Sequence, residues 1–558
     1  MARFTSEPLR GSVLHDGLVV GEAEQPGAGL GLRATSSFSE GAPVYRERAR
    51  VFVQSRFSAR AAPACLECGR LVGGGLEEVL EQVLRSCEGT RVRLKSPAAA
   101  QEYPTSLAGY PHLRKSDLLG DARLALPPCV SCPAGCGAAF CSDSCMDEQL
   151  QGGHHRVLCA ERSAAQRSAW REFREHAQRH SETLLLAALV VAQAICDVLY
   201  GGRSLDEVAA SYVQFYAQSW PEKVSEDVAE RHVWVRKRWA VLEASHALLL
   251  DVLGDCAPPG LADMVSLSGF ALVAGMIELV SKDLERRNPL DAPLKDVLEA
   301  LPMRAKTELR KITLLWMTAR ADAQEAEEPT SPEDSEDEET ASCCRNSKGA
   351  PDAERVASLA VLPVFEGFGL VRSVAVTNHS CAPNVEVEVS GETADVVALA
   401  LGAISAGEEL TMSYIDEGMP RAARQRLLRR SYGFHCHCPR CEEEGGPPGE
   451  PARPSACRDG ARCSDVAAPD SRHHGEQGAP GELARASTCR AGAAAEGLAD
   501  GPLRAAPAPI RVASRGEAES GQESAGGEER ERRPASRRGA GAGRAGSAED
   551  GPESVGPP

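Results

Sequence analysis

The segment Asn378-His379-Ser380-Cys381-Ala382-Pro383-Asn384 carries the strongest indication of the fold. It is followed by 407–414, Gly-Glu-Glu-Leu-Thr-Met-Ser-Tyr, and then by 432–441, Tyr-Gly-Phe-His-Cys-His-Cys-Pro-Arg-Cys. The first and third segments both contain cysteine. A metal ion bound between them would tie the C-terminal end of this region onto its strands and would contribute folding energy directly.

Three thiols close the third segment: Cys436, Cys438 and Cys441. Three thiolates leave one position of a tetrahedral Zn²⁺ ion open, so a fourth ligand must come from elsewhere. Cys381 is the favoured fourth ligand because it lies in the first segment. His435 and His437 are the alternatives.

Eight further candidate ligands occur as four close pairs: Cys65 and Cys68, Cys132 and Cys136, Cys141 and Cys145, and His155 and Cys159. A close pair presents two ligands to one ion, and two pairs complete a tetrahedral site. We expect an interleaved arrangement, in which the first and third pairs bind one zinc ion and the second and fourth pairs bind another. Cys129 in place of Cys132, and His154 in place of His155, are open alternatives. The chain would then hold three zinc ions.

Composition excludes several classes of protein. The 558 residues carry a formal net charge of -18, which argues against binding nucleic acid or anionic lipid through the whole surface. Within Cys132–Cys159, Arg156 is the one Lys or Arg residue, so direct DNA binding by the zinc block is not expected. The chain opens without a secretory signal, and 20 cysteines in a reducing compartment favour metal ligation over disulfides.

The longest apolar stretch, Leu184–Cys196, is too short to span a bilayer and is expected to be part of a buried helix. Arg167–Thr318 as a whole is expected to be helical, with one helix in Leu184–Leu199 and another in Val224–Leu253. We therefore expect no association with a membrane.

Strands are expected in Gly17–Gln54, where short apolar runs alternate with glycine turns. A hairpin is expected from Val385–Val389 and Val396–Leu401. The block Cys65–Cys159 shows little helical periodicity. Nine acidic residues and no basic residue occur in Glu325–Glu339, which is typical of a disordered linker.

After the third segment the composition changes. Residues 442–558 contain no Phe, Trp or Tyr and are rich in Gly, Ala, Pro, Arg and Glu. Such a segment cannot bury enough apolar surface to offset its chain entropy, so a disordered tail is expected.

The three C-terminal segments together resemble the C-terminal half of a SET domain and its post-SET zinc motif. Gly27–Ala34 (Gly-Ala-Gly-Leu-Gly-Leu-Arg-Ala) resembles the glycine turn that opens the same domain, and the eight-ligand block resembles a MYND zinc module. This order is similar to that of the SET and MYND domain protein-lysine methyltransferases. The string from Cys132 to Cys145, and Ser413-Tyr414-Ile415-Asp416-Glu417, resemble the plant trithorax-related histone-lysine type most.

The resemblance implies an α+β fold: a SET-domain β fold with a pseudoknot, split by the MYND module and a helical insertion. It divides the chain into the N-terminal SET part (14–60), the MYND-type zinc module with an insertion (61–160), the helical insertion (161–322), the acidic linker (323–355), the C-terminal SET part (356–435), the post-SET zinc motif (436–441) and the tail (442–558).

The resemblance also implies roles for individual residues. S-adenosylmethionine would be held by Gly29, Gly31, Asn378, His379 and Phe434. Tyr414 matches the catalytic tyrosine of the family and, together with Tyr432, would line the channel for the substrate lysine. Aromatic walls suit a sulfonium cofactor and a methylammonium product, because both cations are attracted to ring faces.

The implied function is S-adenosylmethionine-dependent methylation of lysine in histones or other proteins, in the nucleus or the cytoplasm. The competing hypothesis is a catalytically weak or inactive adaptor, which recruits proline-rich peptides through the MYND module. It is motivated by Val280 and Ser281, which stand where relatives carry an asparagine that contacts the cofactor.

Overall fold

The computed structural model describes residues 13–15, 17–25, 29–93, 100–212, 218–224, 228, 230–325 and 362–445. The chain divides into two compact units, Met1–Cys457 and Arg458–Pro558, and every described residue belongs to the first. Most of the expected acidic linker and nearly all of the expected tail lie outside the described residues, as do Gly27 and Ala28 of the glycine turn.

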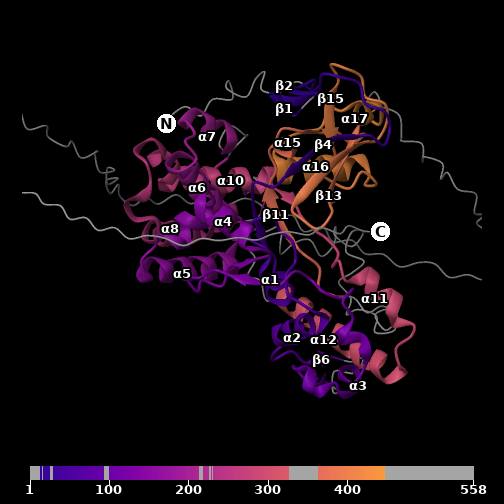
Figure 1. Ribbon diagram of the computed structural model, residues 1–558. Coiled ribbons are helices and arrows are strands. Elements are labelled where there is room, and N and C mark those ends of the chain that lie inside the picture. The colour runs from indigo at the N-terminus through magenta and orange to yellow at the C-terminus, as the bar shows by residue number, and fades with distance from the viewer. Residues whose placement is uncertain are drawn as a thin grey trace, which may run out of the picture. The chain divides into compact units, whose positions relative to one another are not determined.

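A five-stranded sheet combines the two ends of the described chain. Its strand order is β1 (Val13–His15), β2 (Leu18–Glu22), β3 (Leu30–Ala34), β15 (Glu409–Met412) and β12 (Asn378–His379). β15 pairs antiparallel with β3 and parallel with β12, so it lies between the N-terminal strands and the histidine segment. Figure 1 shows this as indigo strands lying beside orange ones. The sheet therefore brings the glycine turn close to Asn378 and His379.

Two three-stranded sheets complete the strand region. One has the order β13 (Val385–Ser390), β14 (Asp395–Ala400) and β4 (Pro43–Arg48), and the antiparallel pairing of β13 with β14 confirms the expected hairpin. The other has the order β10 (Lys282–Asp283), β11 (Gly367–Leu370) and β5 (Val51–Gln54). Each sheet pairs an N-terminal strand with strands from far along the chain.

The helical region is built around α6 (Glu182–Leu199), whose residues 184–197 are all buried. It packs against α5 (Ala164–His180), α10 (Leu267–Val280) and strand β5, while α8 (Arg231–Leu253) packs mainly on α5. By length and composition α6 could cross a membrane, and the bent pair Pro259–Val265 and Leu267–Val280 passes the same test together. Because 78 % of its apolar window is buried inside the protein, α6 has the surroundings of a core helix.

The second expected helix begins later than predicted, at Arg231 rather than Val224. Trp220–Glu222 forms a single helical turn with Pro221 in its first positions, and Val224 follows it. Glu230, the residue before α8, has a φ of 55°. A non-glycine residue with positive φ does not continue a right-handed helix, so α8 begins only after it.

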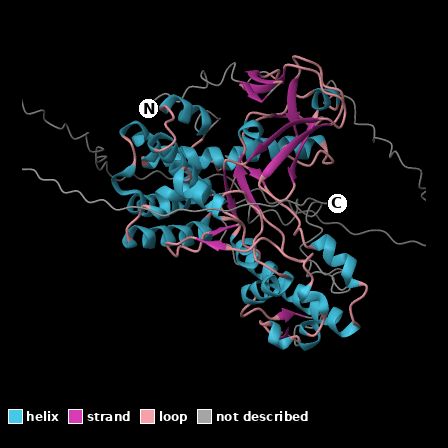
Figure 2. Ribbon diagram, viewed as in Figure 1, coloured by secondary structure: helices cyan, strands magenta, loops and turns pink. Residues whose placement is uncertain are grey.

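The expectation of little helical periodicity between Cys65 and Cys159 was wrong for one segment. α2 (Leu76–Ser86) is an amphipathic helix that buries Leu76, Val79, Leu80, Val83 and Leu84. Positions spaced by three and four residues form one apolar face, which packs against α1 (Arg56–Ala61) and α12 (Met303–Glu325). The insertion between the first two ligand pairs therefore joins a helical group that includes the last helix of the helical region (Figure 2).

The remaining elements are short. The helices are α3 (Pro111–Arg114), α4 (Asp143–Gln151), α7 (Leu205–Tyr212), α9 (Ala262–Val265), α11 (Asp291–Leu298), α15 (Arg372–Ala375), α16 (Arg421–Tyr432) and α17 (Pro439–Glu443). Two small antiparallel pairs are formed by β6 (Val92–Arg93) with β7 (Ala100–Gln101), and by β8 (Val130–Ser131) with β9 (Ala139–Phe140).

Candidate active site and metal centres

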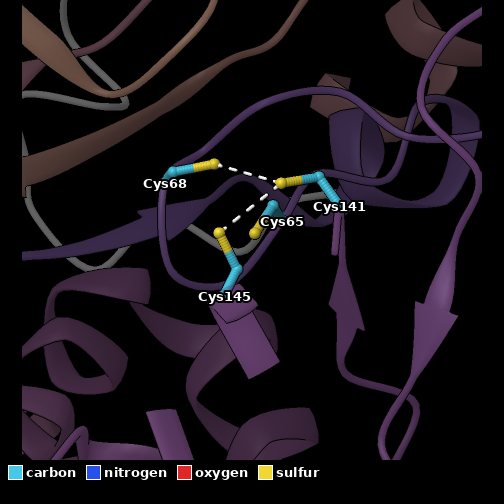
Figure 3. A group of neighbouring side chains, drawn as sticks. All are labelled: Cys65, Cys68, Cys141 and Cys145. Carbon is cyan, nitrogen blue, oxygen red and sulfur yellow. Dashed lines mark hydrogen bonds between the residues drawn. The ribbon is translucent and has the colours of Figure 1, made fainter. Parts of the chain in front are cut away.

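Cluster 1 consists of Cys65, Cys68, Cys141 and Cys145, whose sulfur atoms all lie within 4.8 Å of one another. The first two lie on the turn after α1, and Cys145 lies in the first turn of α4, where the Ser142 hydroxyl accepts the Cys145 N–H. Figure 3 shows the four side chains directed toward one another, with Cys141 3.6 Å from both Cys68 and Cys145. Local turn and cap geometry thus positions each ligand pair.

Cluster 2 consists of Cys132, Cys136, His155 and Cys159, all of them buried. Nε2 of His155 lies 3.2 Å from Sγ of Cys132 and 3.7 Å from Sγ of Cys136. The alternatives considered from the sequence lie outside the cluster. Cys129 is exposed, and both ring nitrogens of the buried His154 have no hydrogen-bond partner among the described residues.

Cluster 3 consists of Cys381, Cys436, Cys438 and Cys441, again all buried. Sγ of Cys381 lies 3.6 Å from that of Cys441 and 4.0 Å from that of Cys436, while His435 and His437 are not part of the group. The cluster joins the end of strand β12 to the segment after α16.

The donor sets fit zinc. Four thiolates, or three thiolates and an imidazole, are typical ligand sets of structural zinc, and a Zn–S bond of about 2.3 Å places tetrahedral sulfur atoms about 3.8 Å apart. The sulfur–sulfur distances of 3.6 to 4.0 Å agree with that spacing. Each of the three groups could therefore hold one ion.

Tyr414 lies two residues beyond strand β15, among other aromatic side chains. Its ring centroid is 5.0 Å from that of Tyr432 and 5.3 Å from that of His379, and Phe434 lies 6.1 Å from His379. The Tyr414 hydroxyl donates to the carbonyl oxygen of Thr377 at 2.7 Å. The structure thus brings Tyr414, Tyr432, Phe434 and His379 into one group.

Burial sets the protonation of this group. Desolvation raises the pKa of Tyr414 above its usual value, and the negative charges of Tyr432 and Glu409 act in the same direction. Desolvation lowers the pKa of His379 to about 4, with a further contribution from the charge of Arg424. A neutral His379 agrees with its Nδ1, which accepts the Tyr414 N–H at 3.0 Å.

Asn378 fastens the glycine turn to the site. Its amide donates to the carbonyl of Leu30 at 3.0 Å and to a carboxylate oxygen of Glu409 at 2.7 Å. The Glu409 carboxylate is buried and also accepts the backbone N–H of Glu24 at 2.5 Å. A Cβ atom at Gly31 would lie 2.3 Å from that carboxylate, so a side chain larger than hydrogen does not fit there.

Gln25 forms a bridge close by. Its amide nitrogen donates to the carbonyl oxygen of His379 at 3.1 Å, and its amide oxygen accepts the N–H of His437 at 3.3 Å. Gly29, just before strand β3, has a φ of 77°, and a Cβ atom there would meet no other atom within 4 Å, so its backbone borders open space. The His379 carbonyl, the His437 N–H and the backbone at Gly29 therefore line one edge of the site.

Sequence reasoning did not identify Glu409, Gln25 or Arg424 as residues of the site. Arg424 is buried beside cluster 3, where its guanidinium donates to Sγ of Cys441 at 3.7 Å and to Glu444 at 2.6 Å. A positive charge there would offset part of the negative charge of four thiolates that hold a metal ion. The sequence did contain a signal for Glu409, because this residue begins strand β15 and directly precedes the buried Leu410.

Comparison with known proteins identifies the family. The family model described as SET domain matches residues 29–415, which is more than half of the chain. The Arabidopsis thaliana protein named histone-lysine N-methyltransferase ATXR2 is 28 % identical over 348 residues, which cover 57 % of this chain and 63 % of that protein.

Two further relatives match shorter segments. The mouse protein named histone-lysine N-methyltransferase SMYD3 is 40 % identical over 78 residues, 14 % of this chain and 18 % of that protein. The Schizosaccharomyces pombe protein named SET domain and MYND-type zinc finger protein 6 is 40 % identical over 67 residues, 12 % of this chain and 14 % of that protein. The chain therefore spans under two thirds of the length of these relatives. Because the SET model covers more than half of the chain, including strands β3, β15 and β12 of the five-stranded sheet, the chain belongs to the SET domain family.

Proposed function

We propose that this chain is an S-adenosylmethionine-dependent protein-lysine N-methyltransferase that acts on lysines of histones or other proteins. The observation that carries the proposal is the Tyr414 hydroxyl, which donates to the Thr377 carbonyl oxygen among aromatic rings beside Asn378 and His379. The names of two relatives, both histone-lysine N-methyltransferases, support the reaction class.

The residues around the site suit the cofactor. The open backbone at Gly29 and the absent side chain at Gly31 would let a ligand approach strand β3 closely. The His379 carbonyl and the His437 N–H, now bonded to the amide of Gln25, form an acceptor–donor pair. An adenine edge carries the complementary donor and acceptor, so the base would find two backbone partners there. Phe434 would supply an aromatic face.

S-adenosylmethionine supplies an already activated methyl group, so the chain's residues need only align and desolvate the amine. An aromatic channel between Tyr414 and Tyr432 would lower the pKa of the substrate lysine by desolvation and favour its neutral form. Tyr414 keeps its hydroxyl proton, because burial raises its pKa, and it can orient the amine through hydrogen bonds. The same ring faces would attract the methylated ammonium product.

The domain organisation follows the same proposal. The SET fold would consist of residues 14–60 and 356–435, split by a MYND-type zinc module with an insertion (61–160) and by the helical insertion (161–322). Residues 436–441 would form the post-SET zinc motif. Clusters 1 and 2 would hold the zinc ions of the module, and cluster 3 would hold a third ion. The sulfur and imidazole donor sets support this assignment.

The proposed partners are the lysine-containing substrate protein and a proline-rich peptide at the zinc module. Histone substrates would require the protein in the nucleus, whereas other substrates would be met in the cytoplasm. No direct binding of nucleic acid is part of the proposed function.

Incubation of the zinc-loaded full chain with methyl-labelled S-adenosylmethionine, core histones and a panel of cell proteins tests the proposal. Label should appear on lysine residues, and Tyr414→Phe should abolish it while leaving partner capture unchanged. If calorimetry detects no cofactor binding to a chain that holds its zinc, the enzymatic function is wrong. Partner capture by such a chain would then favour the adaptor.

A further inference from the structure

A surface cavity of about 390 Å³ lies between helices α1 and α5, and no residue of the Tyr414 site or of the three clusters lines it. Its lining residues are Arg56, Ala59, Arg60, Arg171, Arg174, Glu175, Gln178 and Arg179. Five arginines and one glutamate give the lining a formal charge of +4, in a chain whose net charge is -18. The cavity is therefore a local reversal of the overall charge.

Helix periodicity explains how these charges come together. Arg56 and Arg60 are four residues apart on α1, and Arg171 and Arg174 are three apart on α5, so each pair lies on one face of its helix. Like charges at this spacing destabilise a helix unless something compensates them. Among the described residues, no ion pair involves any of the five arginines or Glu175. The nearby carboxylate of Glu182 accepts the backbone N–H of Arg56.

The Arg174 guanidinium has few hydrogen-bond acceptors, which is a second and independent observation. Its Nη2 donates to the carbonyl oxygen of Cys136, in cluster 2, at 3.2 Å. Its Nε is buried and has no hydrogen-bond partner among the described residues. The Arg174 guanidinium thus has one acceptor among the described residues for its five N–H donors, and an anion in the cavity would accept from those N–H groups that reach the lining.

We propose that this cavity binds a small, multiply phosphorylated anion. The planar guanidinium group presents donors in a fork that matches phosphate oxygens, and phosphate groups place several negative charges within a small volume. An acidic peptide spreads single charges along its backbone, so it would neutralise five arginines around one cavity less completely. The volume lies at the lower end of the range of small-molecule sites, which suits a compact ligand.

Inorganic tripolyphosphate is the probe, added to the zinc-loaded full chain in a calorimeter at low ionic strength. We expect saturable binding and a higher melting temperature, because a ligand that binds only the folded state stabilises it. The double substitution Arg60→Gln and Arg171→Gln should weaken binding at least tenfold. Both side chains are exposed, and the one hydrogen bond recorded for either is from Arg171 to the Ser168 hydroxyl, so the fold should persist.

The control is Arg310→Gln, which removes one positive charge, half of that removed in the double variant, from an exposed position on α12, outside the cavity. Its affinity for tripolyphosphate should stay within about twofold of the unmodified chain, since long-range charge effects are screened. Absence of tripolyphosphate binding to the unmodified chain would overturn the proposal. So would an equal loss in the Arg310 variant, or binding of duplex DNA that tripolyphosphate does not displace. Cofactor binding, measured in parallel, should be the same in all variants.

Discussion

Clusters 1 and 3 each consist of four cysteine thiols, but the two clusters lie in different surroundings. Cluster 1 connects the turn after α1 to the start of α4, and the apolar side chains packed on it and on cluster 2 belong to residues 66–159. Cluster 3 is packed directly against Tyr414, Tyr432 and Phe434. An ion bound at cluster 1 would therefore stabilise residues of that segment, whereas an ion bound at cluster 3 would stabilise the walls of the candidate active site.

Cluster 3 is also connected to the candidate active site along the chain and through a close polar contact. Cys381 follows His379 by two residues, and Nε2 of His379 lies 3.3 Å from Sγ of Cys381. Phe434 precedes Cys436 by two residues on the other side. Loss of an ion at cluster 3 should thus displace site residues directly, whereas loss at cluster 1 should leave them in place.

Removal of one ligand from each cluster gives the largest expected difference. Cys438→Ser should lower the zinc content by about one ion and reduce cofactor affinity by at least about 100-fold, because the aromatic wall loses its anchor. Cys68→Ser should lose about one ion as well, yet change cofactor affinity no more than about threefold. Zinc analysis and calorimetry on the same samples measure both. Equal losses of affinity in the two variants would contradict the separation of roles.

Tyr414→Phe probes the site without touching either cluster. We expect kcat to fall about 100-fold or more, since the amine loses a positioning hydroxyl, while the cofactor dissociation constant stays nearly constant. Tyr200→Phe is the matched control, because that hydroxyl contacts Glu161 far from the aromatic group. Single-turnover methylation rates and calorimetry separate the two quantities. A variant that keeps its kcat would remove Tyr414 from the reaction.

The candidate metal ligands were more predictable from the sequence than the other candidate site residues. A pair such as Cys65 and Cys68 is confined to one turn, so its spacing alone limits which atoms can share an ion. The hairpin of β13 and β14 was likewise visible, since strict alternation of Val and Glu has one structural interpretation. Helix α2 was not expected, because its regular apolar face at Leu76, Val79 and Val83 is short and lies in the insertion between the first two ligand pairs.

Contacts between distant segments left no local signal. Gln25 meets His379 and His437 only because β2 and β3 share a sheet with β12 and β15. The arginine cavity likewise depends on the packing of α1 beside α5, two helices that each look like ordinary solvated surfaces in isolation. Such sites require the tertiary structure.

Neighbouring glutamates allow a smaller, sharper test of the site. The Glu409 carboxylate joins Asn378 to the Glu24 backbone, whereas that of Glu408 accepts from Asn384 and from the Ser405 N–H. Glu409→Gln should raise the KM for the cofactor about tenfold with little change in kcat, because one charge-assisted hydrogen bond near the glycine turn is weakened. Glu408→Gln should leave KM within about twofold. Steady-state kinetics with varied cofactor distinguish them, and a fall in kcat alone would exclude a positioning role.

The smallest expected effect concerns alkaline pH. Burial raises the pKa of Tyr414, so its hydroxyl stays protonated between pH 7 and 10. The methylation rate should therefore rise with deprotonation of the substrate lysine and then level off without declining.

The raised pKa of Tyr414 also affects the pH dependence of stability. A raised folded-state pKa contributes stability that is complete below the unfolded value of about 10 and is lost as the pH rises through the folded value. Wild-type stability should therefore fall above pH 10, by up to about 1.4 kcal/mol per pH unit from this hydroxyl. Tyr414→Phe lacks the ionising group, so its denaturant midpoint should fall less between pH 10 and 11. An equally steep fall in the variant would assign the loss of stability to other tyrosines, such as Tyr432, whose pKa desolvation also raises.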